Sequence, residues 1–147
     1  KGRLHNWWTK EDFKHFEGSA ARLVAQYNGY KPFPDLAVNG KLTLGENIAD
    51  LAGLAAAYDA YLRSLGGKPA PAVQGFTGDQ QFFISFAQGW RGKLREPALR
   101  NRILTDGHAP YEYRASTARN LDAWYTAFDV KAGETLYLPP ADRVRVW

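Results

Sequence analysis

Two acidic residues, Glu46 and Asp50, stand four positions apart at the start of a segment with helical character. Because four residues make slightly more than one helical turn, both carboxylates fall on one helix face, roughly 40° apart. In a zinc site one carboxylate can bind the metal while a second orients the other ligands. Acids in the first turns of a helix are also stabilised by the helix dipole, so this spacing alone leaves both interpretations open. Small residues flank the pair and allow another element to approach closely: Gly45, Ala49, Ala52 and Gly53.

A second group of residues that could do chemistry lies further along the chain, in a region expected to be irregular over residues 106–118. Asp106 and His108 are close neighbours there, and Arg114 follows six residues after the histidine. A histidine and an arginine in one loop can together bind a carbonyl oxygen or an oxyanion. A lone loop histidine is more often an ordinary surface residue, so this group does not assign a function by itself.

Several other kinds of catalytic site are excluded by residues that the sequence lacks. It has no cysteine, which removes disulfides, thiolate catalysis and cysteine-based metal sites. His5 and His15 are too far apart to form a zinc-binding pair on one helix face, and both are expected to be exposed. There is no H-E-x-x-H motif, no glycine-rich phosphate loop and no serine in a nucleophile elbow.

The net charge of +4 permits an anionic partner without requiring one. We expect no nucleic-acid partner, because the aromatic residues fall at core-facing helical positions and do not alternate with basic residues as a stacking platform would. No apolar run approaches the roughly 20 residues that cross a bilayer, so this segment should make no membrane contact. A non-catalytic peptide-binding module or pseudoenzyme, which uses its loops without a metal, is the alternative to an enzyme.

Apolar periodicity and turn signals predict a mainly α-helical chain. The helices are expected at residues 8–28, 45–65 and 120–130, and from Thr77 or Asp79 onward. Pro97 should interrupt or restart the helix that contains it. Residues 66–79, rich in Gly, Pro and Ala, should form a surface loop, and residues 41–44 a short extended segment.

Five segments together resemble the neprilysin family of zinc endopeptidases, which includes the endothelin-converting enzymes and bacterial oligopeptidases. The longest is residues 39–50, NGKLTLGENIAD, similar to the family motif N-G-x-x-T-L-G-E-N-I-A-D. The others are residues 6–9 (NWWT), 82–88 (FFISFAQ), 105–110 (TDGHAP) and 143–147 (RVRVW). The resemblance implies that residues 1–147 are the C-terminal part of a zincin-like, thermolysin-like catalytic domain.

The resemblance also implies a role for each residue that matches a family motif. Glu46 becomes the third zinc ligand, and Asp50 accepts a hydrogen bond from a zinc-bound histidine. His108 stabilises the oxyanion of the tetrahedral intermediate.

Substrate-binding roles are implied for three more residues. Arg114 holds a backbone carbonyl of the substrate, and Asp106 orients either that arginine or the loop. Trp90 lines the pocket for the residue after the cleaved bond. Gly89 stands where the family has a larger apolar residue, so this pocket should be larger.

The family's H-E-x-x-H helix and its N-terminal lobe have no counterpart in these residues, so two zinc ligands and the general base are missing. We therefore expect a zinc-dependent endopeptidase that cleaves oligopeptides only with the rest of the protein as its partner, and an inactive chain when it is alone. Since the sequence has no methionine and begins at Lys1, it is expected to be a fragment or a processed form.

Two departures from the family pattern indicate the kind of organism from which the protein comes. Arg91 and Val144 stand where extracellular animal members carry cysteines, which favours a disulfide-free bacterial relative. The resemblance implies a location outside the cytoplasm, periplasmic or secreted, and it is compatible with a membrane anchor in missing N-terminal residues.

Overall fold

The structure is a computed structural model that describes residues 2–146, so Lys1 and Trp147, the last residue of the RVRVW segment, lie outside the described residues. The elements in chain order are α1 (Lys10–Asn28), α2 (Leu44–Ser64), α3 (Gly78–Gly89), α4 (Glu96–Thr105), α5 (Tyr111–Ala115), η1 (Ser116–Asn120), α6 (Asp122–Phe128) and η2 (Pro140–Asp142). Between residues 2 and 146 the only β pairing is two isolated bridges, Phe33 with Leu36 and Val73 with Phe76. The mainly α prediction is confirmed.

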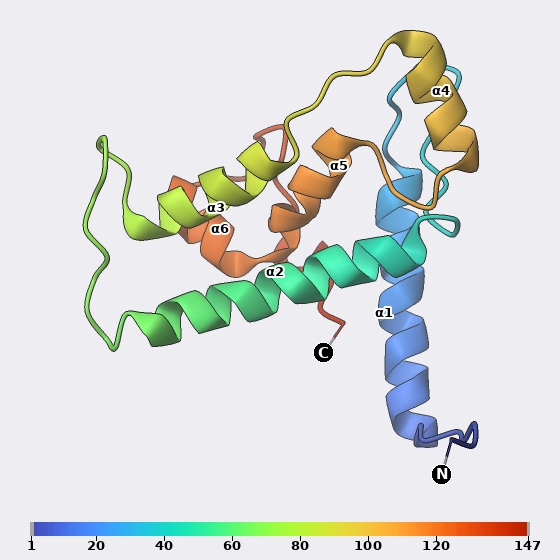
Figure 1. Cartoon of the computed structure of the whole chain (residues 1–147), viewed down its shortest axis with the longest axis horizontal. Helices are drawn as coiled ribbons and strands as arrows, with labels where there is room; N and C mark the ends of the chain where they lie inside the picture. The colour runs from blue at the N-terminus through green and yellow to red at the C-terminus, as the bar shows by residue number, and fades with distance from the viewer. Residues whose placement is uncertain (1, 147) are drawn as a thin grey trace.

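Helix α2 is the central element of the fold. In Figure 1 it runs across the molecule, with α1 crossing its N-terminal end and α3, α5 and α6 lying along one side. Leu51 of α2 packs into one buried cluster, and Leu54, three residues later, packs into another. The first cluster joins α1, α2 and the C-terminal tail (Leu23, Tyr27, Val38, Leu51, Ala109, Val144 and Val146), and the second joins α2, α3 and η1 (Leu54, Phe83 and Ala118). Both clusters hold α2 in place, and Glu46 and Asp50 with it.

The helix boundaries follow local capping signals in the sequence. The Thr9 hydroxyl accepts a hydrogen bond from the backbone N–H of Asp12 at the start of α1. Thr77 and Gln80 form a reciprocal capping box at the start of α3. Gly66 and Gly67, directly after α2, both have positive φ angles that side chains disfavour. Pro97 lies in the first turn of α4, so it starts a separate helix after a non-helical segment.

Two predicted segments differ in the structure. Residues 41–44 are not extended, because the Asn39 side chain accepts hydrogen bonds from the backbone N–H groups of Lys41 and Leu42 and closes a turn that leads into α2. The region 106–118 is not irregular throughout, since α5 and η1 occupy residues 111–120. Pro110 stands just before α5, where its missing N–H costs no helical hydrogen bond. Arg114 therefore projects from a helix and not from the loop of His108.

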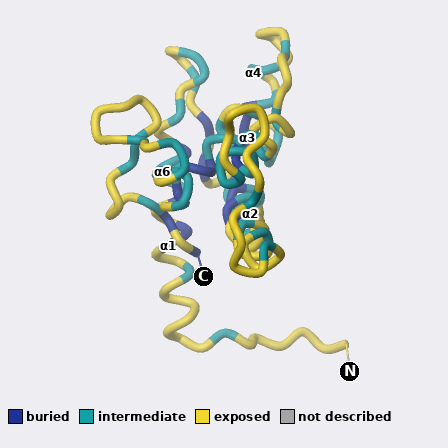
Figure 2. The backbone as a smooth tube through the Cα atoms, turned by 90° about the vertical axis from the view of Figure 1, so that its left-hand side faces the viewer, coloured by how far each residue is buried: buried dark blue, intermediate teal, exposed yellow. Residues whose placement is uncertain are grey.

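The chain exposes more surface than a compact protein of its size. Its accessible surface is 9930 Å², whereas a self-contained protein of 16.5 kDa exposes about 7,500 Å². Figure 2 shows the exposed segment before α1 and the first turns of that helix extending away from the rest. Large apolar side chains are also exposed, including Leu4, Trp7, Phe13 and Leu104. Across residues 2–146, no helix combines the length and apolar character needed to span a membrane.

Candidate active site

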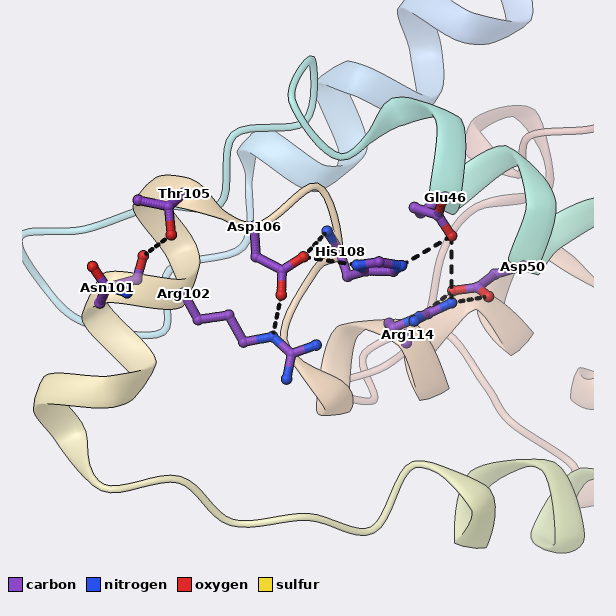
Figure 3. Close-up of polar contacts among 8 residues, drawn as sticks. All are labelled: Glu46, Asp50, Asn101, Arg102, Thr105, Asp106, His108 and Arg114. Carbon is purple, nitrogen blue, oxygen red and sulfur yellow. Dashed lines mark hydrogen bonds and ion pairs between the residues drawn. The ribbon is translucent and has the colours of Figure 1, made fainter.

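The structure brings all of the predicted site residues into one connected group, contributed by several elements. Glu46 lies in the first turn of α2, and Asp50 lies one turn further along the same helix. Asp106 ends α4, His108 lies between α4 and α5, and Arg114 projects from α5. Figure 3 shows their side chains in a row between the end of α4 and the start of α2. Trp90 joins this row from the C-terminal end of α3, through its contact with Arg114.

The start of α2 is fixed by a close contact between the preceding turn and α1. The Asn28 side chain accepts a hydrogen bond from the Gly40 backbone N–H at 2.8 Å. A Cβ atom at Gly40 would lie 2.3 Å from the Val24 carbonyl oxygen, so only glycine fits this approach. At the other end of the turn, the Asn47 side chain donates to the Thr43 hydroxyl within the buried interior. These contacts determine where the Glu46 carboxylate projects.

His108 lies between two carboxylates. Its Nδ1 is 2.7 Å from Oδ1 of Asp106, and its Nε2 is 3.2 Å from Oε2 of Glu46. Oδ1 of Asp106 also accepts the backbone N–H of His108 at 2.9 Å. That backbone hydrogen bond, together with the imidazole and the Arg102 charge, holds the pKa of Asp106 below its usual value. Asp106 therefore contacts both the backbone and the ring of His108, and its predicted role in orienting this loop stays a prediction.

Arg114 is held by Asp50. Its Nε and one terminal nitrogen donate to the two Asp50 oxygens, each at 2.7 Å, in a bidentate pair. The side chains of Asp50 and Arg114 are only 9% and 13% exposed. The hydrogen bonds from the guanidinium to Asp50 raise the pKa of Arg114. The bidentate partner of this arginine is thus Asp50, and the alternative that Asp106 orients Arg114 stays a prediction.

Trp90 and Glu46 complete the surroundings of Arg114. The guanidinium carbon lies 4.0 Å from the centre of the Trp90 ring, a cation–π contact that fixes the plane of the arginine. The same guanidinium is 4.0 Å from Oε2 of Glu46. Arg114 thus connects the Glu46–His108 pair to Asp50 and to the tryptophan.

An apolar cavity of about 770 Å³ opens beside this group, between α2 and α3. Its walls include Asp50 and Gly53 from α2, Phe86 from α3, and Gly89 and Trp90 at the end of α3. A Cβ atom at Gly89 would meet nothing within 4 Å, so this glycine does leave open space at the cavity wall. The same holds for Gly45 and Gly53, which no other part of the described chain approaches closely.

Sequence reasoning did not identify Arg102 as part of this group. Its Nε lies 3.0 Å from Oδ2 of Asp106, and its guanidinium lies over the Tyr111 ring at 4.6 Å. The available signal was the spacing of Arg102 and Asp106, four residues apart on α4, which favours ion pairing.

Within residues 2–146, no three His, Asp or Glu side chains form a cluster that could hold a metal ion. Glu46 offers the most accessible carboxylate of the group, with its side chain 46% exposed. Within the described chain, the contacts of Glu46 with His108 and Arg114 both use Oε2, which leaves Oε1 available to a cation. Carboxylate oxygen is an accepted zinc ligand, so Glu46 fits the role of a single ligand that other parts of a protein complete.

The helical fold and this group of residues are those of the C-terminal part of a metallopeptidase. The chain belongs to Peptidase family M13, whose profile matches residues 1–144. It is 36% identical to Neprilysin-11 of Caenorhabditis elegans and 37% identical to a neutral endopeptidase of Lactobacillus helveticus, each over 99% of this chain. The chain spans about a fifth of these relatives, 18% and 21% of their lengths.

Solved structures agree with this assignment. The zinc metalloprotease Zmp1 of Mycobacterium tuberculosis, in complex with an inhibitor, superposes with a TM-score of 0.96 at 43% identity, over 99% of this chain and 23% of that one. PepO from Lactobacillus rhamnosis gives a TM-score of 0.80 at 35% identity, over 99% of this chain and 22% of that one. Because relatives come from both bacteria and animals, the expected bacterial origin stays a prediction.

Proposed function

We propose that this chain is the C-terminal part of a zinc-dependent endopeptidase that hydrolyses oligopeptides, and that Glu46 is its third zinc ligand. The observation that carries the proposal is the arrangement of Glu46, an accessible carboxylate beside His108 and Arg114, one helical turn before Asp50 in the wall of an apolar cavity. Membership of Peptidase family M13 supports the reaction class. The coverage of about a fifth of each relative supports the view that other parts of the protein complete the site.

Glu46 would hold the zinc ion through its free oxygen, with two histidines of an H-E-x-x-H helix supplied by the rest of the protein. When bound, the zinc polarises the substrate carbonyl and lowers the pKa of a water molecule to about 7. Asp50, one turn further along α2, retains unused lone pairs on both oxygens after binding Arg114. It can therefore also accept a hydrogen bond from a ligating histidine, which fixes the orientation of that ring.

His108 is arranged to donate to a developing oxyanion. With Nδ1–H donating to Asp106, the opposite nitrogen, Nε2, points toward Glu46 and the proposed metal position. Nε2 can donate at the same time only when the imidazole carries both protons. Removing one such donor typically costs about 3 kcal/mol of transition-state stabilisation.

Arg114 is proposed to bind a backbone carbonyl of the substrate. Asp50 and the Trp90 ring fix its position, and the described contacts use only Nε and one terminal nitrogen. The other terminal nitrogen is free to donate to a peptide oxygen. The apolar cavity next to Trp90 would receive the side chain after the cleaved bond, and its open wall at Gly89 accommodates a large apolar residue.

The chain alone is proposed to be inactive, because no described residue replaces the missing general base and a single carboxylate binds zinc weakly. Its partner is the remainder of the same protein. The surface excess of about 2,400 Å² over a compact protein of this mass supports a large intramolecular interface. By its resemblance to the neprilysin family we also propose an extracytoplasmic location.

Zinc titration tests the division of ligands. Calorimetry on the isolated chain should show only weak, non-stoichiometric zinc binding, whereas the complete protein should hold one zinc ion and cleave oligopeptides. Tight stoichiometric binding by the isolated chain would contradict the proposal. A complete protein that binds peptides without zinc and without cleavage would instead support the non-catalytic peptide-binding alternative.

A further inference from the structure

A second cavity, of about 650 Å³, is also lined by Trp90. Because Trp90 lines both this cavity and the apolar cavity between α2 and α3, the two cavities are neighbours. The walls of the second cavity come from residues 90–94, from α4 and from the start of α5. It differs from the first in its charge, because Arg91, Lys93 and Arg102 all line it.

Arg102 is built into the cavity wall in a fixed orientation. Its side chain is 20% exposed, its guanidinium stacks over the Tyr111 ring at 4.6 Å, and its Nε lies 3.0 Å from Oδ2 of Asp106. Gly92 allows Tyr111 to occupy this place, since a Cβ atom there would lie 2.5 Å from the ring. Figure 3 shows the two terminal nitrogens on the side of the guanidinium away from Asp106. Those nitrogens form no hydrogen bond within residues 2–146, since the closest contact of the guanidinium with Asp106 is through Nε.

This unused pair of donors distinguishes Arg102 from the other well-ordered arginines nearby. Arg100 has both terminal nitrogens on Asp35, and Arg114 has one of them on Asp50. A guanidinium with a planar edge free matches a carboxylate, which it binds through two parallel hydrogen bonds. Burial of that edge in a cavity strengthens the interaction over the same contact at an open surface.

The remaining charges of the cavity also favour an anion. Arg91 and Lys93 are exposed at its rim, and neither forms an ion pair within the described chain. Glu112 is the one acidic residue in the lining. Three cations therefore line the cavity together with one carboxylate, and Asp106, which lies outside the lining, is the further anion in contact with Arg102.

We propose that this basic cavity is a substrate subsite that binds a carboxylate on the C-terminal side of the cleaved bond. The inference rests on the proposed peptidase function and deepens it by assigning a charge preference. Its position follows from two sets of contacts: Arg102 reaches His108 through Asp106, and Trp90 lines both the basic cavity and the apolar one. The carboxylate belongs to a residue beyond the one that fills the apolar cavity, either as an acidic side chain or as the C-terminus of the peptide.

Cleavage kinetics of the complete protein test the subsite. The substrates are peptides of one sequence that carry Glu or Gln at each successive position after the cleaved bond, with a free or an amidated C-terminus. If the ligand is an acidic side chain, Glu at one position should give a kcat/KM about tenfold higher than Gln, with or without amidation, as expected for a charged hydrogen bond at a partly buried site. If the ligand is the C-terminal carboxylate, Glu and Gln peptides should be cleaved equally well, and amidation should lower kcat/KM about tenfold.

Variants link the preference to these residues. Arg102→Gln and Lys93→Gln should each lower the ratio of kcat/KM for the Glu peptide to that for the Gln peptide. Arg91→Glu combined with Lys93→Glu should shift the preference toward a Lys peptide. Arg95→Gln is the matched control, because Arg95 is a cation of the same segment that does not line the cavity, and it should keep the wild-type ratio.

Calorimetry separates this inference from the proposed function. Binding of the Glu and Gln peptides to the complete protein reports the carboxylate preference without any cleavage. If the protein cleaves no peptide yet binds the Glu peptide about tenfold more tightly, the proposed function fails and the subsite stands. Equal binding and equal cleavage of acidic, neutral and amidated peptides would overturn the subsite while leaving the peptidase intact.

Discussion

The buried pair of Asp50 and Arg114 should be a main source of rigidity at this site. Two hydrogen bonds of 2.7 Å join side chains that are 9% and 13% exposed, so removing either partner leaves a charge in a poorly solvated place. Breaking a buried pair typically costs about 3–5 kcal/mol. Arg114 retains a second anion, Glu46 at 4.0 Å, and its contact with Trp90, which lowers the expected loss for Asp50→Ala to about 2–4 kcal/mol.

A double-mutant cycle on the 147-residue chain measures this interaction. The free energies of unfolding in urea, followed by tryptophan fluorescence, are compared for wild type, Asp50→Ala, Arg114→Ala and the double variant. The coupling energy should be about 2 kcal/mol, within the range for residues in direct contact.

The matched control is a cycle on Asp35 and Arg100. This pair is also bidentate, with distances of 2.9 and 3.1 Å, but its side chains are 68% and 34% exposed. Its coupling should be much smaller, because solvent screens exposed charges. A coupling for Asp50 and Arg114 no larger than that of the control would refute the view that the pair holds the site together.

Three further predictions concern stability. Gly40→Ala forces a Cβ atom to within 2.3 Å of the Val24 carbonyl oxygen and should lower the free energy of unfolding by about 1–3 kcal/mol. Gly53→Ala is the control, because a Cβ atom there meets no atom within 4 Å and should not lower the free energy of unfolding. Equal urea midpoints for the two variants would contradict this prediction. Tyr27→Phe removes a buried hydroxyl 2.8 Å from Oγ1 of Thr117 and should cost about 1–2 kcal/mol, and an unchanged midpoint would count against it. Hydrogen bonding to Arg143 lowers the pKa of Asp122 in the folded protein. The ionised carboxylate therefore stabilises the fold fully above its unfolded pKa of about 3.9. This stabilisation is lost as the pH falls through the lower pKa of the folded state. The difference in unfolding free energy between wild type and Asp122→Asn should therefore be constant near neutral pH and shrink in acid, while a pH-independent difference would show that the charge is not responsible.

The helices could be predicted from sequence because their signals are local. Thr9, Thr77 and the Gly66–Gly67 pair mark helix ends through hydrogen bonds or backbone angles within a few residues. Helix α5 was missed for the same reason, because five residues are too few for an apolar period to appear. The turn at residues 41–44 was mistaken for an extended segment because its closing contact comes from the side chain of Asn39, which precedes it.

The site itself was predictable only in part. The spacing of Glu46 and Asp50 placed two carboxylates on one face, but their partners, His108 and Arg114, come from positions about sixty residues later and were joined to them only by family resemblance. Local spacing carries no information on which distant helix will pack nearby. Arg102 was overlooked because its significance depends on Tyr111, a contact that only the folded chain creates.

The zinc content of the complete protein tests the central claim most directly. Metal analysis of the purified protein should give one zinc ion per chain for wild type, and much less for Glu46→Ala. Glu11→Ala, which removes another glutamate from the first turn of a helix, should retain the full zinc content. Full zinc in the Glu46→Ala protein, or none in the wild type, would contradict the assignment of Glu46 as a zinc ligand.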